Sequence, residues 1–120
     1  MKLTLALLVA AGLFAASAAG AHPLPKATTP APNAVLATSP AEIRMTFSEG
    51  LVAAFSGLEL KDQAGKAVDL GPSSVDSKNK KQLFAPVKAA LGAGTYTVNW
   101  HAVAADTHHV SGHFSFQVKP

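Results

Sequence analysis

The chain has 120 residues, contains no cysteine and carries a formal net charge of +3 at pH 7. This length suits one small domain, and so small and dispersed a basic excess argues against a nucleic-acid partner. Without cysteine there are no disulfides and no thiolate metal sites, so stability depends on packing.

Residues 1–21 have the three parts of a secretory signal peptide. Lys2 supplies the positive charge, residues 3–14 form the apolar segment, and residues 19–21 are a cleavage motif of small residues. An uncleaved membrane anchor is the alternative, because the apolar stretch approaches the length of a spanning helix. The alanine- and glycine-rich end favours cleavage and an exported, periplasmic protein. Cleavage after residue 21 makes His22 the mature N-terminus, whereas cleavage after residue 19 leaves two residues before it.

The next part of the chain predicts an extended segment and then two strands. Residues 22–40 are rich in proline and are expected to be extended, with an edge strand near residues 34–38. Residues 41–47 alternate between apolar and polar side chains, which is typical of a half-buried antiparallel strand. The inward residues of this strand are Ile43, Met45 and Phe47. Residues 57–61 repeat the pattern with Leu58 and Leu60 inward.

Turn residues separate these strands from the last part of the chain. Residues 62–66 read as a turn, and residues 69–81 read as a polar loop. No helical period longer than a turn or two interrupts the short extended segments. We therefore expect residues 22–120 to form one all-β domain, a small Greek-key β-sandwich or barrel.

The last two strands predict a β-hairpin with a polar tip. Large side chains alternate along both, and a constant register would pair Tyr96 with Val118, Val98 with Phe116, and Trp100 with Phe114. This register places Asp106 and His108 at the tip, on either side of Thr107. It also sets His101 opposite His113 on the polar face.

The mature N-terminus and the hairpin tip together predict a copper(II) site. An N-terminal His22 would offer an α-amine and an imidazole, and Asp106 and His108 would complete the nitrogen and oxygen donors that copper(II) prefers. Pro23 has no amide N–H to lose, so deprotonated backbone nitrogens cannot wrap the metal. The remaining ligands must then come from the folded domain.

Several of these residues also have simpler interpretations. One alternative for Asp106 is that it caps its own turn instead of binding metal, and another is that it does both. His109 is expected to be a solvated neighbour of His108. His101 and His113 form a possible second, weaker metal site, although two imidazoles on an exposed sheet face are usually just solvated, and we favour that interpretation.

The ordered motifs of the mature chain resemble the CopC family of periplasmic copper-resistance proteins. The motifs are His22-Pro23, Phe47-Ser48-Glu49, Phe55-Ser56-Gly57-Leu58, Gly94-Thr95-Tyr96, Trp100, Asp106-Thr107-His108, Gly112 and Phe116. The resemblance implies a β-sandwich of immunoglobulin-like or cupredoxin-like form that binds one copper(II) through His22, Asp106 and His108. It implies a non-enzymatic carrier whose partners are an inner-membrane copper transporter or another periplasmic copper protein. It also implies that Glu49 lies near the site, where we expect it to orient a ligand histidine.

One departure from the family bears on the metal. Some members carry a methionine-rich loop for copper(I), but residues 62–82 here contain neither methionine nor histidine. Met45, the one methionine beyond the predicted signal peptide, is expected in the core, so no thioether site for copper(I) is predicted.

Two other functions stay open. An oxidative polysaccharide-cleaving enzyme also holds copper through an N-terminal histidine, but it needs exposed aromatic residues, and nearly all aromatics here are assigned to inward faces. A structural β-sandwich with incidental histidines is the third alternative, and failure to bind copper would select it.

Overall fold

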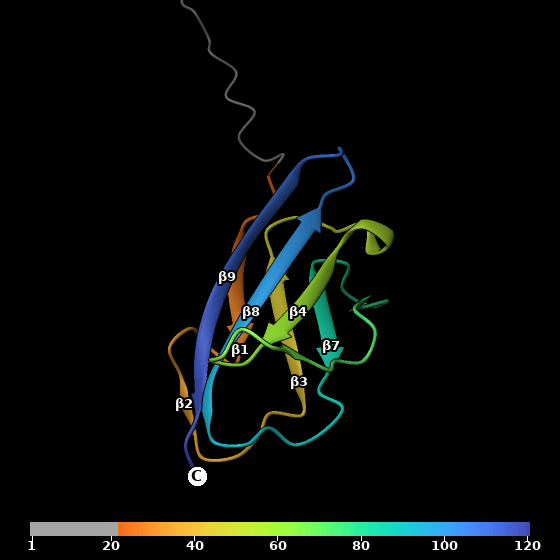
Figure 1. Cartoon of the computed structure of the whole chain (residues 1–120). Helices are drawn as coiled ribbons and strands as arrows, with labels where there is room; N and C mark the ends of the chain where they lie inside the picture. Colours follow the sequence, from red (N-terminus) through yellow and green to blue (C-terminus); the bar gives the residue numbers. More distant parts are fainter. Residues whose placement is uncertain (1–21) are drawn as a thin grey trace, which may run out of the picture.

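The computed structural model describes residues 22–120, so the predicted signal peptide lies outside the described residues. These residues form two β-sheets packed face to face (Figure 1). One sheet has the order β1 (Pro25–Thr29), β3 (Glu42–Phe47), β7 (Gln82–Pro86), β6 (Ser74–Val75). The other has the order β2 (Val35–Leu36), β9 (His109–Val118), β8 (Gly94–Val103), β4 (Gly57–Lys61), β5 (Ala67–Val68). A single 3₁₀ turn, η1 (Ala53–Phe55), precedes β4. The expected all-β sandwich is confirmed.

Alternating side chains of both sheets fill the space between them. On β3, Ile43, Met45 and Phe47 are at most 1% exposed, as their spacing predicts. Leu58 and Leu60 of β4, which belongs to the other sheet, are also buried between the two sheets. The aromatic residues of the last two strands, Tyr96, Trp100, Phe114 and Phe116, belong to the same core. Within residues 22–120, no helix is long and apolar enough to cross a membrane.

The segments between the strongly alternating strands agree with the predictions in part. Residues 62–66 form the expected turn, in which Asp62 Oδ1 accepts hydrogen bonds from the N–H groups of Ala64 and Lys66, both at 2.9 Å. The predicted edge strand is present as β2, which pairs in parallel with β9. Residues 69–81 are not wholly loop, because β6 forms there and pairs with β7.

The predicted register of the β8–β9 hairpin was wrong by two residues. Tyr96 pairs with Phe116, Val98 with Phe114, and Trp100 with Gly112. A shift of two residues leaves every side chain on its predicted face. The indole of Trp100 explains the shift, because a Cβ at position 112 would lie 2.6 Å from Trp100 Cζ2. Only a glycine opposite Trp100 leaves room for the ring.

Two parts of the chain that are far apart in sequence meet at one end of the sandwich. The tip of the β8–β9 hairpin lies at the top of Figure 1, and the segment leading into β1 runs beside it. Pro23, which precedes β1, is fully buried. The fold therefore brings the residues around position 22 to the hairpin tip.

Candidate metal centre

The segment that carries His22 is held by Ser48, the residue after β3. The Ser48 hydroxyl donates to the His22 carbonyl at 3.3 Å and accepts from the Leu24 N–H at 2.9 Å. The Ser48 N–H in turn donates to the Leu24 carbonyl at 2.8 Å. Together with the buried ring of Pro23, these bonds fix the backbone beside His22 while its side chain stays exposed.

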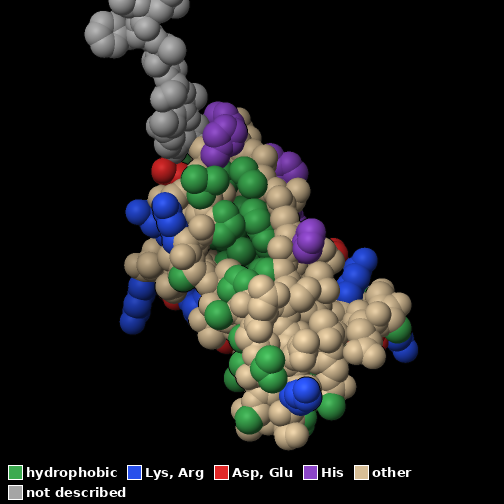
Figure 2. Space-filling model, turned by 90° about the vertical axis from the view of Figure 1, so that its left-hand side faces the viewer, with side chains coloured by type: hydrophobic (Ala, Val, Ile, Leu, Met, Phe, Trp, Pro, Cys, Tyr) green, Lys and Arg blue, Asp and Glu red, His purple; other side chains and the backbone are tan. Residues whose placement is uncertain are grey.

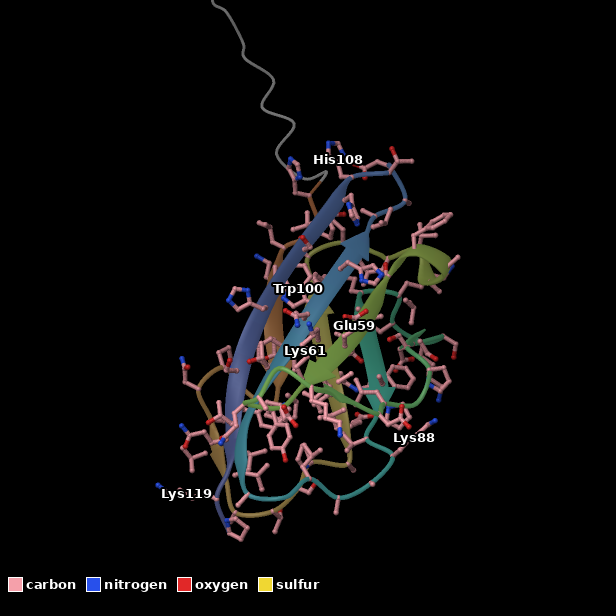
Figure 3. All side chains as sticks on the ribbon, in the orientation of Figure 1. Glu59, Lys61, Lys88, Trp100, His108 and Lys119 are labelled. Carbon is pink, nitrogen blue, oxygen red and sulfur yellow. The ribbon has the colours of Figure 1, made fainter. Side chains whose placement is uncertain are left out.

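The ring of His22 lies against the ring of His108. Their centroids are 4.5 Å apart with an interplanar angle of 70°, an edge-on arrangement. Figure 3 shows His108 at the hairpin tip, and Figure 2 shows histidine side chains gathered at this end of the molecule beside a strip of apolar surface. The structure thus brings together two of the three residues predicted to bind metal.

Asp106 contacts His108 with both oxygens of its carboxylate. Oδ2 lies 2.9 Å from His108 Nδ1, and Oδ1 accepts from the His108 backbone N–H at 3.2 Å. That backbone N–H is the main cause that lowers the pKa of Asp106 below its usual value, and the His108 ring adds to the effect. Asp106 therefore caps its own turn, which confirms one of its two expected roles, and it is held as an anion beside the imidazole.

The turn itself contains a strained residue. Thr107 has a φ of 72°, a left-handed conformation that is unfavourable for a β-branched side chain. It is held by its N–H, which donates to the Ala104 carbonyl at 2.9 Å, and by the Ala104 N–H, which donates to the His108 carbonyl at 3.0 Å. This conformation turns the Asp106 carboxylate back onto His108.

Glu49 shares a surface cleft with Asp106. The cleft has a volume of about 440 Å³ and is lined by Glu49, Gly50, Leu51, Val52, Lys80, Ala104, Ala105 and Asp106. A backbone bridge between Leu51 and Ala104 ties the Glu49 segment to the hairpin. Glu49 thus lies on the same side of the tip as Asp106, with the cation of Lys80 in the same cleft.

The three predicted ligands are close in pairs but do not surround one point. Among residues 22–120, no three histidine, aspartate or glutamate side chains are grouped closely enough to hold a metal ion. The side chains of His108 and Asp106 are 40% and 42% exposed. Both side chains are therefore accessible to an ion from solvent.

The remaining histidines lie on the outer face of the five-stranded sheet. The predicted pairing of His101 with His113 was wrong, because the register sets His101 opposite Ser111 and His113 opposite Asn99. The ring near His101 is instead that of His109, with centroids 6.5 Å apart. The glycine opposite Trp100 was the sequence signal for this register, which sets His109 and His113 each two residues from the partner of His101.

Comparisons with known proteins agree with the fold and the motifs. A family model described as the CopC domain matches residues 25–119. Copper resistance protein C of Pseudomonas syringae pv. tomato is 38% identical over 117 residues, which cover 93% of this chain and 92% of that protein. Copper transport protein CutJ of Bacillus subtilis is 28% identical over 98 residues, but these cover only 18% of its length and 82% of this chain.

Two solved structures have the same architecture. CopC from Methylosinus trichosporium OB3b superposes with a TM-score of 0.77 at 25% identity, covering 82% of this chain and 95% of that one. PcoC, described as a methionine-rich copper resistance protein from Escherichia coli, superposes with a TM-score of 0.73 at 33% identity, covering 82% of this chain and all of that one.

Proposed function

The chain belongs to the CopC family of copper resistance proteins, whose role is to bind copper. We propose that this protein is a periplasmic carrier of one copper(II) ion, which is bound by His22, Asp106 and His108. The observation that carries this proposal is the 4.5 Å contact between the rings of His22 and His108. Folding brings an imidazole from each of two distant segments to one point. The α-amine of a mature His22 and the Asp106 carboxylate complete the four donors that copper(II) prefers.

The contact between Asp106 and His108 supports a defined role for each ring nitrogen. A histidine that donates its Nδ1–H to a carboxylate presents the lone pair of Nε2, which is the usual arrangement around metal-binding histidines. The 2.9 Å distance from His108 Nδ1 to Asp106 Oδ2 fits this tautomer. Asp106 keeps further lone pairs for the ion, since a carboxylate can accept about four contacts.

Glu49 is proposed to support the site from the neighbouring cleft. Its carboxylate lies on the Asp106 side of the tip, where a second negative charge favours a bound cation and can accept a hydrogen bond from a ligand histidine. We place Glu49 outside the ligand set because the amine, the two imidazoles and Asp106 already supply four donors.

The proposed ion is copper(II) rather than copper(I). Copper(I) prefers thiolate and thioether ligands. The only such side chain among residues 22–120 is that of Met45, which is 1% exposed and packed in the core. PcoC, by contrast, is described as methionine rich.

Carriage is favoured over oxidation of a bulky substrate. An oxidase of polysaccharides needs several aromatic side chains exposed around its copper ion. Tyr96, Trp100 and Phe114 are each less than 10% exposed, and among residues 22–120 Phe55 is the one aromatic that is largely exposed, at 63%. A carrier exchanges its ion with other proteins, and we propose a copper transporter of the inner membrane or another periplasmic copper protein as that partner. The similarity to one segment of a much longer copper transport protein supports this choice.

The deciding experiment compares two N-termini. The first protein begins at His22, and the second carries one added methionine, which converts the α-amine to an amide and leaves both imidazoles and Asp106 intact. The added residue should not affect the metal-free fold, because chain termini tolerate short extensions. Equal melting curves of the metal-free proteins are the control.

The protein that begins at His22 should bind one copper(II) tightly, with nitrogen couplings in its electron paramagnetic resonance spectrum. In a competition titration the extended protein should bind at least about 100-fold more weakly, which is the upper end of the effect of removing a group that only supports a ligand. Equal affinities and equal spectra would show that the N-terminal amine is not a ligand, and tight copper(I) binding would contradict the choice of ion.

A further inference from the structure

A second pair of imidazoles lies on the side of the hairpin that faces away from the sandwich interior. His101 on β8 and His109 on β9 are both exposed, and their ring centroids are 6.5 Å apart with an interplanar angle of 63°. Among the hydrogen bonds within residues 22–120, none uses a ring nitrogen of either residue. Both rings therefore have nitrogen lone pairs available to an ion from solvent.

The distance between the rings is compatible with a shared metal ion. Imidazole nitrogens bind zinc and similar ions at about 2.0–2.1 Å, so two rings on one ion have centroids roughly 4.5 to 6.5 Å apart, depending on the angle at the metal. The observed 6.5 Å lies at the upper end of this range. Small rotations of two exposed side chains are sufficient to direct one nitrogen of each ring to a common point.

The sheet provides room for the ring of His101. This ring lies over Gly57 of β4, where a Cβ would be only 2.8 Å from His101 Cε1. Any larger residue at position 57 would push the ring away from the sheet. The glycine thus lets the His101 ring lie close to the strands on the β4 side of β8, and rotation of this exposed side chain toward β9 would bring it nearer to His109.

We propose that His101 and His109 bind a second divalent transition-metal ion, copper(II) in preference to zinc or nickel, at lower affinity than the first site. Two imidazoles supply two ligands, water supplies the others, and the general order of stabilities places copper(II) above its neighbours. This inference goes beyond the proposed carrier function, because it uses none of its ligands. His108 and His109 are consecutive, but the His108 ring lies against His22, whereas the ring near His109 is that of His101.

His113 provides a matched control for this pair. It lies on the same outer face of β9 as His109. His101 pairs with Ser111, and His109 and His113 each stand two residues from Ser111, in opposite directions. Only the His109 ring is close to His101. If any exposed histidine could bind the second ion, a His113 variant would lose as much affinity for it as a His101 or His109 variant. If the ion binds at the proposed site, the His113 variant would keep its affinity.

The test is a copper(II) titration of the protein that begins at His22, in competition with a chelator, together with the single variants His101→Gln, His109→Gln and His113→Gln. The parent should bind two ions in sequence. His101→Gln and His109→Gln should each lower the affinity for the second ion by at least about 100-fold, more than the loss of a group that only supports a ligand. Both should leave the first ion unaffected, and His113→Gln should leave both ions unaffected.

A zinc(II) titration followed by the imidazole nitrogen signals in nuclear magnetic resonance identifies the rings directly. Shifts of the His101 and His109 signals, with His113 unchanged, would support the site, as would a second binding event that persists after a methionine is added before His22. A parent that binds a single copper(II) ion, or a His113→Gln variant that loses the second ion as fully as His101→Gln does, would overturn the proposal.

Discussion

Asp106 and His108 act as a unit in which the carboxylate sets the orientation of the ring. Asp106 contacts both the backbone N–H and Nδ1 of His108, within a turn that depends on the left-handed Thr107. Loss of either side chain therefore removes one ligand together with a contact of the other. Without Asp106 the His108 ring is free to rotate, and without His108 the carboxylate has no imidazole beside it.

We expect Asp106→Ala and His108→Ala each to weaken binding of the first copper(II) ion by more than about 100-fold, beyond the range of groups that only support a ligand. The measurement is a chelator competition titration. His101→Ala, His109→Ala and His113→Ala should leave the first affinity nearly unchanged, and all five variants should stay folded because these side chains are partly or fully exposed. A loss in His113→Ala equal to that in His108→Ala would mean that the ligands are wrongly assigned.

Glu49 should affect affinity to a smaller extent. Its place in the cleft beside Asp106 predicts that Glu49→Gln lowers copper(II) affinity by about 10- to 100-fold, the usual effect of a group that supports a ligand. The same titration checks this, and the nitrogen couplings in the spectrum should be preserved. Complete loss of binding would instead make Glu49 a direct ligand.

At the scale of elements, the β8–β9 hairpin depends on the pairing of the largest side chain with the smallest residue. Trp100 occupies the space over Gly112, and a Cβ there would lie 2.6 Å from Cζ2 and 2.9 Å from Cε2 of the indole. These ring atoms cannot move freely, because Trp100 is 8% exposed and packs edge-on against Phe47, with ring centroids 5.3 Å apart.

Gly112→Ala should therefore lower the free energy of unfolding by about 1–3 kcal/mol, the usual cost of overpacking a core. Chemical denaturation of the metal-free protein measures this. Gly92→Ala is the matched control, because a Cβ at position 92 meets no atom within 4 Å. If the two variants were equally stable, the close contact between Trp100 and position 112 would be wrong.

The hairpin also illustrates what the sequence can and cannot predict. Alternation on β3, β4, β8 and β9 correctly predicted which side chains face the core, because burial imposes a period of two. The same period leaves the register undetermined by multiples of two residues, so pairing the large side chains of β8 and β9 with one another gave a shifted answer. The register depends on side-chain volume, since the Trp100 ring lies over position 112, where only a glycine leaves room for it.

For the candidate site too, the sequence predicted one contact and left another undetermined. Asp106 and His108 are two residues apart, so their proximity was predictable from the turn. The contact of His22 with His108 depends on the burial of Pro23 and on the bonds of Ser48, neither of which follows from spacing in the sequence. The motif resemblance implied it, and the packing provides the physical reason.

At the scale of the whole molecule, the proposed copper ion joins two parts of the sandwich that belong to different sheets. The His22 segment leads into β1 of the four-stranded sheet, and Asp106 and His108 lie on the hairpin of the five-stranded sheet. An ion bound by both segments is bound only while the sheets are packed together. Copper(II) should therefore bind the native state more tightly than the unfolded chain, which keeps only the amine and imidazole of His22 together.

Binding of this kind should stabilise the protein by at most about 2.7 kcal/mol when free copper(II) is 100 times the dissociation constant, because any binding to the unfolded chain reduces the effect. The midpoint of thermal unfolding, measured with and without copper(II), should rise accordingly. The His108→Ala variant should show a much smaller rise under the same conditions. An equal rise in that variant would mean that the stabilising ion is bound elsewhere.

The burial of Pro23 has a further consequence for the thermodynamics of copper capture. With the adjacent proline buried, His22 samples only a small volume next to His108, so its effective concentration at the hairpin tip is high before any ion arrives. The entropy lost in bringing the two segments together is an entropy of folding, not of binding. A peptide that carries both motifs without the sandwich would lack this advantage, and the intact domain should bind the ion with a smaller loss of conformational freedom.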